Sequence, residues 1–302
     1  MTRGGMTSRA AIASVAVALF LLIIKGFAAA ETGSIAMLGS LADTALDLAA
    51  SLVTLFSVRY AATPADDDHR FGHGKAEALS ALFQVVLISV SALAIGWRAT
   101  ERLIGGTAQT QAPEYGIGVS VIAMIVTLGL LAYQRRVIAS TGSVAIHADH
   151  VHYQSDLLLN GAVIAALLLD SLLSLRGADA VFGILIAFWL LWGAWQSASN
   201  AVDQLLDKEW PLERKQRLVE IVTGHNDVKG IHDIRTRSSG SADFCQFHIW
   251  LDPEMPIIQA HEVMDEVEDA LNFEFPDVEF LIHPDPEGHQ DEIDYTPSET
   301  LH

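Results

Sequence analysis

Apolar residues along this chain gather in six long runs, each of the length that an α-helix needs to cross the hydrocarbon core of a bilayer. The runs lack the alternation of polar and apolar positions that is typical of barrel strands, so we expect six transmembrane helices. Short turns separate several neighbouring runs, which favours an up-and-down bundle. The expected spans cover residues 9–30, 34–60, 76–104, 114–134, 144–173 and 178–201.

The pattern changes after Asp207, where shorter amphipathic segments replace the apolar runs. We expect helices at 211–224 and 256–272 and strands at 231–238, 243–251 and 278–284, with a turn at Ser239-Gly240-Ser241. The order αββαβ indicates an α+β domain of the split-βαβ kind, with helices on one face of a small sheet. The predicted organisation is a six-span transmembrane domain over 1–207 with a loop at 61–75, an αββαβ domain over 208–286 and a disordered polar tail over 287–302.

Charge is distributed unevenly between these two parts. The whole chain has a net charge of −19, made of −2 in residues 1–202 (11 basic, 13 acidic) and −17 in residues 203–302 (7 basic, 24 acidic). Such an acidic domain repels nucleic acid and attracts cations. The single cysteine, Cys245, excludes a disulfide within the chain and a CxxC metal knuckle.

The lysines and arginines between the spans predict the orientation in the membrane. The side that is richer in them should face the cytoplasm, which places both termini and the acidic domain inside. Lys25 lies within the first span, and we interpret it as reaching toward the nearer interface. The richer side has Arg3, Arg9, Arg59, Arg70, Lys75, Arg135, Arg136 and Lys208, and the other side has Arg98, Arg102 and Arg176.

Two expected spans carry carboxylates and histidine at helical spacing. Asp43 and Asp47 are four residues apart in the second span, as are His152 and Asp156 in the fifth, so each pair lies on one helix face. Charged groups inside a membrane are costly and mark functional sites. Three carboxylates and one imidazole suit a tetrahedral divalent ion such as zinc. The alternative is that these groups are hydrogen-bonding contacts between helices.

Histidines near the cytoplasmic side suggest further metal sites. His147 and His150 fall on other helix faces from Asp156, and we interpret them as interfacial polar residues. In the loop, Asp66, His69 and His73 could hold one ion, although a histidine-bearing acidic loop is also typical of a solvated connection. The αββαβ domain could form a two-metal site if its strands converge, whereas a lone histidine is usually structural or exposed. Its candidate ligands are His232, His248, His261, His283 and Asp285.

The segments LADTALDLAASL, PADDDHRFGHGKAE, HYQSD and HDIRTRSSG together resemble the cation diffusion facilitator family, in particular its bacterial zinc and iron efflux members. The resemblance implies a homodimer, proton antiport and a ferredoxin-like, metallochaperone-like cytoplasmic domain. It also implies a charge interlock of Lys75 and Asp207 at the dimer interface. One departure is Pro284, where relatives have glutamine. The implied sites are a membrane transport site of Asp43, Asp47, His152 and Asp156, a loop site of Asp66, His69 and His73, and a cytoplasmic binuclear site of His232, His248, His261, His283 and Asp285.

These observations predict a divalent metal exporter of the bacterial inner membrane. Zinc is the expected cargo and also a structural or regulatory ion, and Cd²⁺, Fe²⁺, Mn²⁺ and Co²⁺ suit the same ligands. Protons should compete for these ligands and drive export by alternating access. The alternatives are a metal-gated channel, a membrane-bound metal sensor, or a di-zinc hydrolase, for which the sequence offers no nucleophile motif.

Overall fold

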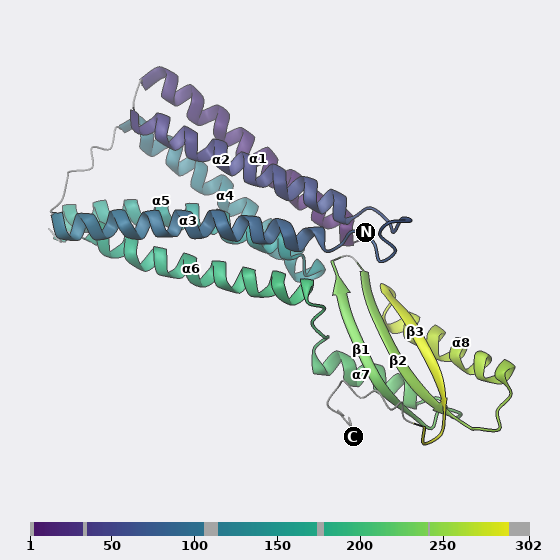
Figure 1. The fold of residues 1–302 in the computed structure, drawn as a ribbon. Helices are drawn as coiled ribbons and strands as arrows, with labels where there is room; N and C mark the ends of the chain where they lie inside the picture. The colour runs from purple at the N-terminus through teal and green to yellow at the C-terminus, as the bar shows by residue number, and fades with distance from the viewer. Residues whose placement is uncertain (1–2, 33–34, 106–113, 174–177, 241, 290–302) are drawn as a thin grey trace. The chain divides into compact units, whose positions relative to one another are not determined.

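A computed structural model describes residues 3–32, 35–105, 114–173, 178–240 and 242–289 of the chain (Figure 1). Its elements fall into two compact units, which are described separately. The first unit comprises Met1–His69 and His73–Val202, and the second comprises Arg70–Gly72 and Asp203–His302. The predicted disordered tail lies, after His289, outside the described residues.

Every regular element in the described part of the first unit is an α-helix, which confirms the predicted helical membrane domain. Helices continue beyond several of the predicted ends, because hydropathy marks the apolar stretch and not the whole helix. The last helix of the bundle continues to Leu205. The six helices are α1 (Arg3–Thr32), α2 (Ile35–Ala61), α3 (Ala76–Gly105), α4 (Glu114–Thr141), α5 (Val144–Leu173) and α6 (Ala178–Leu205).

Five of the helices, α1, α2, α3, α4 and α6, are long and apolar enough among their described residues to cross a membrane. Helix α5 carries polar side chains in its first half, including Asp149, His152 and Asp156. Large apolar side chains such as Trp97 and Phe188 point outward, as expected for a surface in contact with lipid. The polar residues of α5 therefore lie within an otherwise apolar bundle.

Small residues let the helices approach closely. A Cβ placed on Gly183 of α6 would lie 2.9 Å from the Cβ of Ala99 on α3. A Cβ on Gly193 would lie 3.1 Å from Val151 of α5. Without a hydrophobic driving force between helices in lipid, such close packing is a main source of their association. These contacts hold α6 against α3 and α5.

The second unit has the predicted αββαβ order. Its central strand β2 pairs antiparallel with β1 and parallel with β3, and both helices lie on one side of the sheet (Figure 1). The turn between β1 and β2 contains Gly240, whose φ of 64° is in the left-handed region that glycine tolerates. The elements are α7 (Leu212–Thr223), β1 (Gly230–Ser239), β2 (Ala242–Leu251), α8 (Ile257–Glu274) and β3 (Val278–Pro286).

Alternation along β2 separates the hydrophobic core from an open face. Cys245, Phe247 and Ile249 are buried in a cluster with side chains from both helices. Because successive side chains in a strand point to opposite faces, Gln246 and His248 lie on the face away from the helices. The same alternation directs the polar residues near the end of β3 to this open face.

Candidate metal sites

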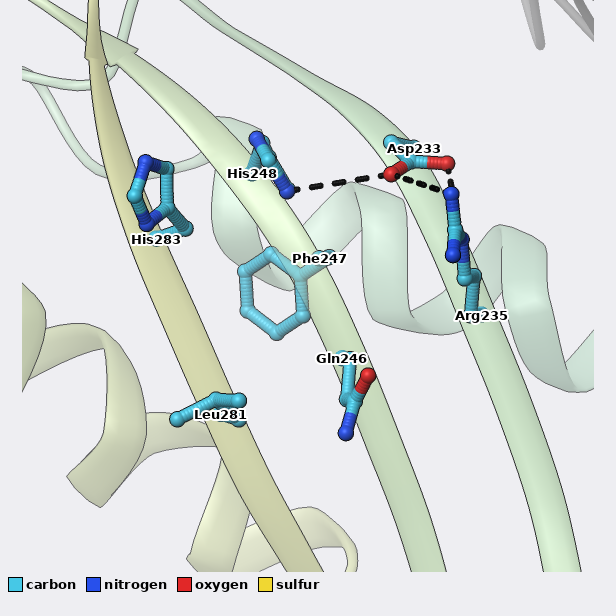
Figure 2. A pocket seen from close by; sticks show the side chains of 7 residues that line it. All are labelled: Asp233, Arg235, Gln246, Phe247, His248, Leu281 and His283. Atoms are coloured by element: carbon cyan, nitrogen blue, oxygen red, sulfur yellow. Dashed lines mark hydrogen bonds and ion pairs between the residues drawn. The ribbon is translucent and has the colours of Figure 1, made fainter. Parts of the chain in front are cut away.

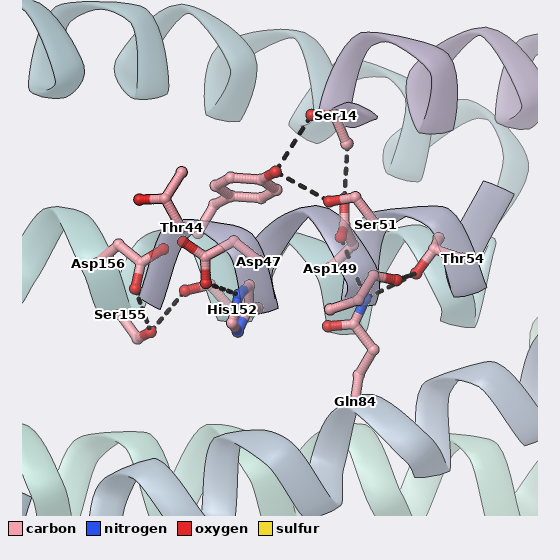
Figure 3. A network of polar contacts seen from close by, with 12 residues as sticks. Ser14, Thr44, Asp47, Ser51, Thr54, Gln84, Asp149, His152, Ser155 and Asp156 are labelled. Atoms are coloured by element: carbon pink, nitrogen blue, oxygen red, sulfur yellow. Dashed lines mark hydrogen bonds and ion pairs between the residues drawn. The ribbon is translucent and has the colours of Figure 1, made fainter. Parts of the chain in front are cut away.

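Three potential ligands meet between α2 and α5, and we refer to them as the helix group: Asp47, His152 and Asp156. One ligand atom from each lies within 4.8 Å of the others. The Oδ1 of Asp47 is 3.0 Å from Nε2 of His152 (Figure 3). His152 and Asp156 are one turn apart on α5, so the predicted i, i+4 spacing accounts for how one helix supplies two of the ligands. The arrangement offers two carboxylates and an imidazole to one small cation.

Asp43, the fourth predicted ligand, lies one turn before Asp47 on α2 but is not in this close group. Its side chain is exposed, whereas Asp47 is half-buried. The structure therefore brings three of the four predicted residues together. The role of Asp43 as a ligand stays a prediction.

Lys25 makes a contact between helices that was not predicted, while its reach toward the membrane interface stays a prediction. It is half-buried, and its Nζ donates a 2.7 Å hydrogen bond to Oγ1 of Thr44 on α2. Thr44 is next to Asp43, and the charge of Lys25 acts on Asp156. The isolated cation in the first span was the signal that could have placed Lys25 near the helix group.

A further carboxylate, Asp149, was not singled out in the sequence. It is fully buried one turn before His152 on α5. Its hydrogen bonds come from Ser14 and Gln84 (Figure 3) and from Gln134. We refer to these four residues as the Asp149 network. Its members belong to α5, α1, α3 and α4, so the network joins four helices.

His147 and His150 each contact a neighbouring helix, and their position at the membrane interface stays a prediction. Both are half-buried. The Nδ1 of His147 is 3.2 Å from Oγ of Ser197 on α6, and the Nδ1 of His150 is 3.2 Å from Oε1 of Gln134 on α4.

The loop between α2 and α3 brings together all three predicted ligands, which we call the loop group: Asp66, His69 and His73. The two carboxylate oxygens of Asp66 are each 3.3 Å from a ring nitrogen, one from His69 and one from His73. The backbone N–H of His69, above all, holds the pKa of Asp66 below its ordinary value, which keeps the carboxylate charged. The buried Nδ1 of His73 has no hydrogen-bond partner among the described residues. These features suit a metal ion in place of the present ion pairs.

A row of histidines crosses the open face of the sheet. Strand register places His232 opposite His248, and His248 opposite His283. The Oδ2 of Asp285 is 2.8 Å from Nδ1 of His248 and 3.3 Å from Nε2 of His232. His232, His248 and Asp285, which we call the sheet group, offer ligand atoms within 4.8 Å of one another.

The two other predicted ligands of this domain differ from each other in position. Nε2 of His283 is 3.4 Å from Oδ1 of Asp285, so His283 adjoins the sheet group. His261 lies on α8 and is exposed, with Asp265 as its ion-pair partner at 3.7 Å. Because α8 covers the opposite face of the sheet, this chain does not bring His261 to the sheet group.

Asp233 is a neighbour of the sheet group that sequence reasoning missed. It sits at a β-bulge with a φ of 47°, where the register between β1 and β2 shifts. Its Oδ2 is 3.7 Å from Nε2 of His248 and 3.1 Å from Arg235 (Figure 2). These side chains line a pocket with His283. The bulge, which is not readable from alternation, turns Asp233 toward the histidines.

The predicted interlock residues are placed within one chain only. The carboxylate of Asp207 is 3.8 Å from the guanidinium of Arg237. Lys75 lies at the start of α3, where its carbonyl accepts from the N–H of Ala78. The pairing of Lys75 with Asp207 across a dimer stays a prediction. Pro284 is exposed on β3, an edge strand that tolerates proline.

Comparison with known proteins decides the family. Residues 11–206 match the family model described as the cation efflux transmembrane domain, and residues 210–287 match the cytoplasmic domain of cation efflux proteins. This chain belongs to the cation diffusion facilitator family. The two matched regions correspond to the helical bundle and to the αββαβ domain, so a cytoplasmic domain follows a transmembrane one.

Curated members of the family are similar over nearly their whole length. The cation-efflux pump FieF of Salmonella arizonae is 46% identical over 285 residues, which cover 94% of each chain. The same pump from Salmonella typhimurium is also 46% identical, and that from Salmonella choleraesuis is 45% identical. This facilitator is accordingly a membrane protein of the cation-efflux type.

Two of the solved structures that match this chain cover about a quarter of it. The zinc form of CzrB is 32% identical, covers 28% of this chain and 98% of its own, and has a TM-score of 0.26. A cadmium form of the MamM C-terminal domain is 25% identical, covers 25% of this chain and 95% of its own, and has a TM-score of 0.24.

Proposed function

We propose that this protein exports zinc from the cytoplasm across the bacterial inner membrane in exchange for protons. The observation that carries the proposal is the convergence of Asp47, His152 and Asp156 inside an apolar bundle. Two carboxylates facing one another in a membrane are costly unless a cation or protons offset their charge. A divalent ion and protons are alternative ways to provide that compensation, which is the basis of an exchange.

The ligand chemistry explains how protons could release the cargo. A carboxylate or imidazole must be deprotonated to bind a metal, so protons and zinc compete for Asp47, His152 and Asp156. An imidazole in its ordinary environment changes charge near neutral pH, which makes His152 the natural group for this competition. Zinc would enter from the cytoplasm, and a rearrangement of the helices would open the group outward. Protons would then displace the ion.

We further infer a homodimer with both termini in the cytoplasm. The lysine and arginine bias supports this orientation. The net charge of −17 over residues 203–302 opposes the approach of two cytoplasmic domains. Zinc on the loop and sheet groups would offset part of that charge, which assigns these groups a regulatory role. In the same dimer, Lys75 and Asp207 would interlock at the interface.

Zinc flux into reconstituted vesicles with an imposed pH gradient tests the proposal. We expect saturable zinc accumulation that requires the pH gradient, and release of protons when zinc binds the detergent-solubilised protein between about pH 5 and 8. Flux that only follows the zinc gradient and does not saturate would indicate a channel, and binding without flux would indicate a sensor. Competition by Cd²⁺, Fe²⁺, Mn²⁺ and Co²⁺ would measure the metal preference.

A further inference from the structure

Among the described residues outside the helix group, Asp149 is the most deeply buried carboxylate. It has no exposed surface. Its Oδ2 accepts from Oγ of Ser14 at 2.6 Å and from Nε2 of Gln134 at 2.8 Å, and its Oδ1 accepts from Nε2 of Gln84 at 3.1 Å. Removing an ionised carboxylate from water is costly, so a carboxylate buried within a membrane usually has a function.

The side chains that hydrogen-bond Asp149 are all neutral. Ser14 comes from α1, Gln84 from α3 and Gln134 from α4, and Gln84 also donates to Thr54 of α2 at 2.6 Å. The titratable groups that interact electrostatically with Asp149 are His152 and Tyr153 on its own helix. His150 is linked to Asp149 through Gln134, to which both are hydrogen-bonded. Among the described residues that hydrogen-bond Asp149, no lysine or arginine neutralises the carboxylate.

The network can hold Asp149 either with or without a proton. When the carboxylate is charged, the Ser14 hydroxyl donates to it. When Asp149 is protonated, its O–H can donate to Oγ of Ser14, and the serine proton can turn to the carbonyl of Ala10, 3.2 Å away. The Nε2 of Gln134, 3.0 Å from Oγ of Ser14, can donate a hydrogen bond in both arrangements. Protonation of Asp149 therefore removes no hydrogen bond from the Asp149 network.

The network is also placed where a conformational change would alter it. Its donors come from α1, α3 and α4, while the carboxylate is on α5 together with His152 and Asp156. Movement of α5 relative to these helices would take hydrogen-bond donors away from the charged Asp149 carboxylate. Without these donors, the low-dielectric interior disfavours the charged carboxylate. Binding a proton would compensate for the lost donors.

We propose that Asp149 is a proton-binding site, separate from the metal ligands, that takes up and releases one proton in each transport cycle. The inference rests on the proposed zinc–proton exchange. With the membrane potential held at zero, a pH difference sustains a ratio of zinc concentrations across the membrane, which we call the zinc ratio. For a difference of one pH unit, each proton exchanged per zinc ion multiplies this ratio by about ten. Loss of one proton from the cycle is therefore measurable at steady state.

The test compares wild-type vesicles with Asp149→Asn vesicles. Asparagine keeps the shape of the side chain but cannot exchange a proton. We expect Asp149→Asn to bind zinc at the helix group and to reach a steady-state zinc ratio about tenfold lower per pH unit. Glu77→Gln is the matched control, because Glu77 is another buried carboxyl, hydrogen-bonded to Ser143 and outside the Asp149 network. It should keep the wild-type ratio.

A wild-type zinc ratio in Asp149→Asn, or an equal loss in Glu77→Gln, would overturn the inference. If Asp149→Asn does not fold, Ser14→Ala retains the carboxyl and removes its closest donor. The pH of half-maximal flux should then rise by about one unit, and an unchanged value would contradict the proposal. If wild-type vesicles accumulate no zinc in response to the pH gradient, the proposed exchange itself fails, independently of Asp149.

Discussion

The helix group and the sheet group contain the same kinds of ligand but are assembled in different ways. In the helix group, His152 and Asp156 come from one turn of α5, and Asp47 comes from one neighbouring helix. In the sheet group, three strands each contribute one residue, from positions as far apart as His232 and Asp285. The helix group is enclosed by an apolar bundle, whereas the sheet group lies on the open face of a sheet. Under the proposed function, the helix group would carry the transported ion, and the sheet group would bind ions reversibly from solution.

The largest effect expected from this comparison is loss of transport when the helix group loses a charge. Asp156→Asn keeps the size of the side chain but removes one of the charges that offset zinc. We expect zinc flux in reconstituted vesicles to fall by more than about 100-fold. Even substitution of a residue that only hydrogen-bonds a metal ligand lowers metal affinity or activity by about 10- to 100-fold. Asp269→Asn, an exposed position on α8, is the control and should transport normally. Near-normal flux in Asp156→Asn would remove this group from the mechanism.

A smaller effect is expected from the sheet group. Zinc at about 100 times its dissociation constant should stabilise residues 208–286 by about 2.7 kcal/mol, or raise Tm by on the order of 10–20 °C. His248→Ala with Asp285→Ala should abolish that rise, and in the full chain should weaken transport without abolishing it. Melting curves with and without zinc measure the first effect, and vesicle flux measures the second.

His261→Ala sharpens the same experiment, because His261 was predicted as a ligand but lies apart from the sheet group. In the isolated domain, we expect it to keep most of the zinc-induced rise. If His261→Ala loses as much of the zinc-induced rise in Tm as the double variant does, then zinc must draw α8 toward the open face. His261 would then be a ligand only in the metal-bound domain.

The smallest effect is expected at Cys245, on the buried side of the same strand as His248. Burial raises the pKa of the Cys245 thiol to about 12, so the thiol stays protonated and is a poor metal ligand at neutral pH. Cys245→Ala should leave zinc affinity unchanged within about twofold, which calorimetry can measure, at a stability cost of about 1 kcal/mol. A thiol reagent should react with the folded wild-type domain only after denaturant is added. Rapid reaction without denaturant would contradict this assignment.

Much of the architecture was predictable because the signals are local. Six apolar runs gave the helices, and the αββαβ order followed from segment lengths and the turn at Gly240. Spacing also predicted that His152 and Asp156 share a helix face. The contact of Lys25 was not predictable, since sequence does not say that Thr44 lies within reach of its ammonium group. Asp149 was overlooked because its partners are distributed over α1, α3 and α4.

The sequence by itself determined the membrane class, the two-domain order, and the residue types available to a divalent ion, because periodicity and hydropathy act over a few residues. Tertiary structure decided which of those residues meet. It placed Asp47 against His152, left Asp43 outside the close group, and separated His261 from His248 by placing them on opposite sides of a sheet. The reason is that strand register and helix packing depend on contacts between distant segments, which no local pattern specifies.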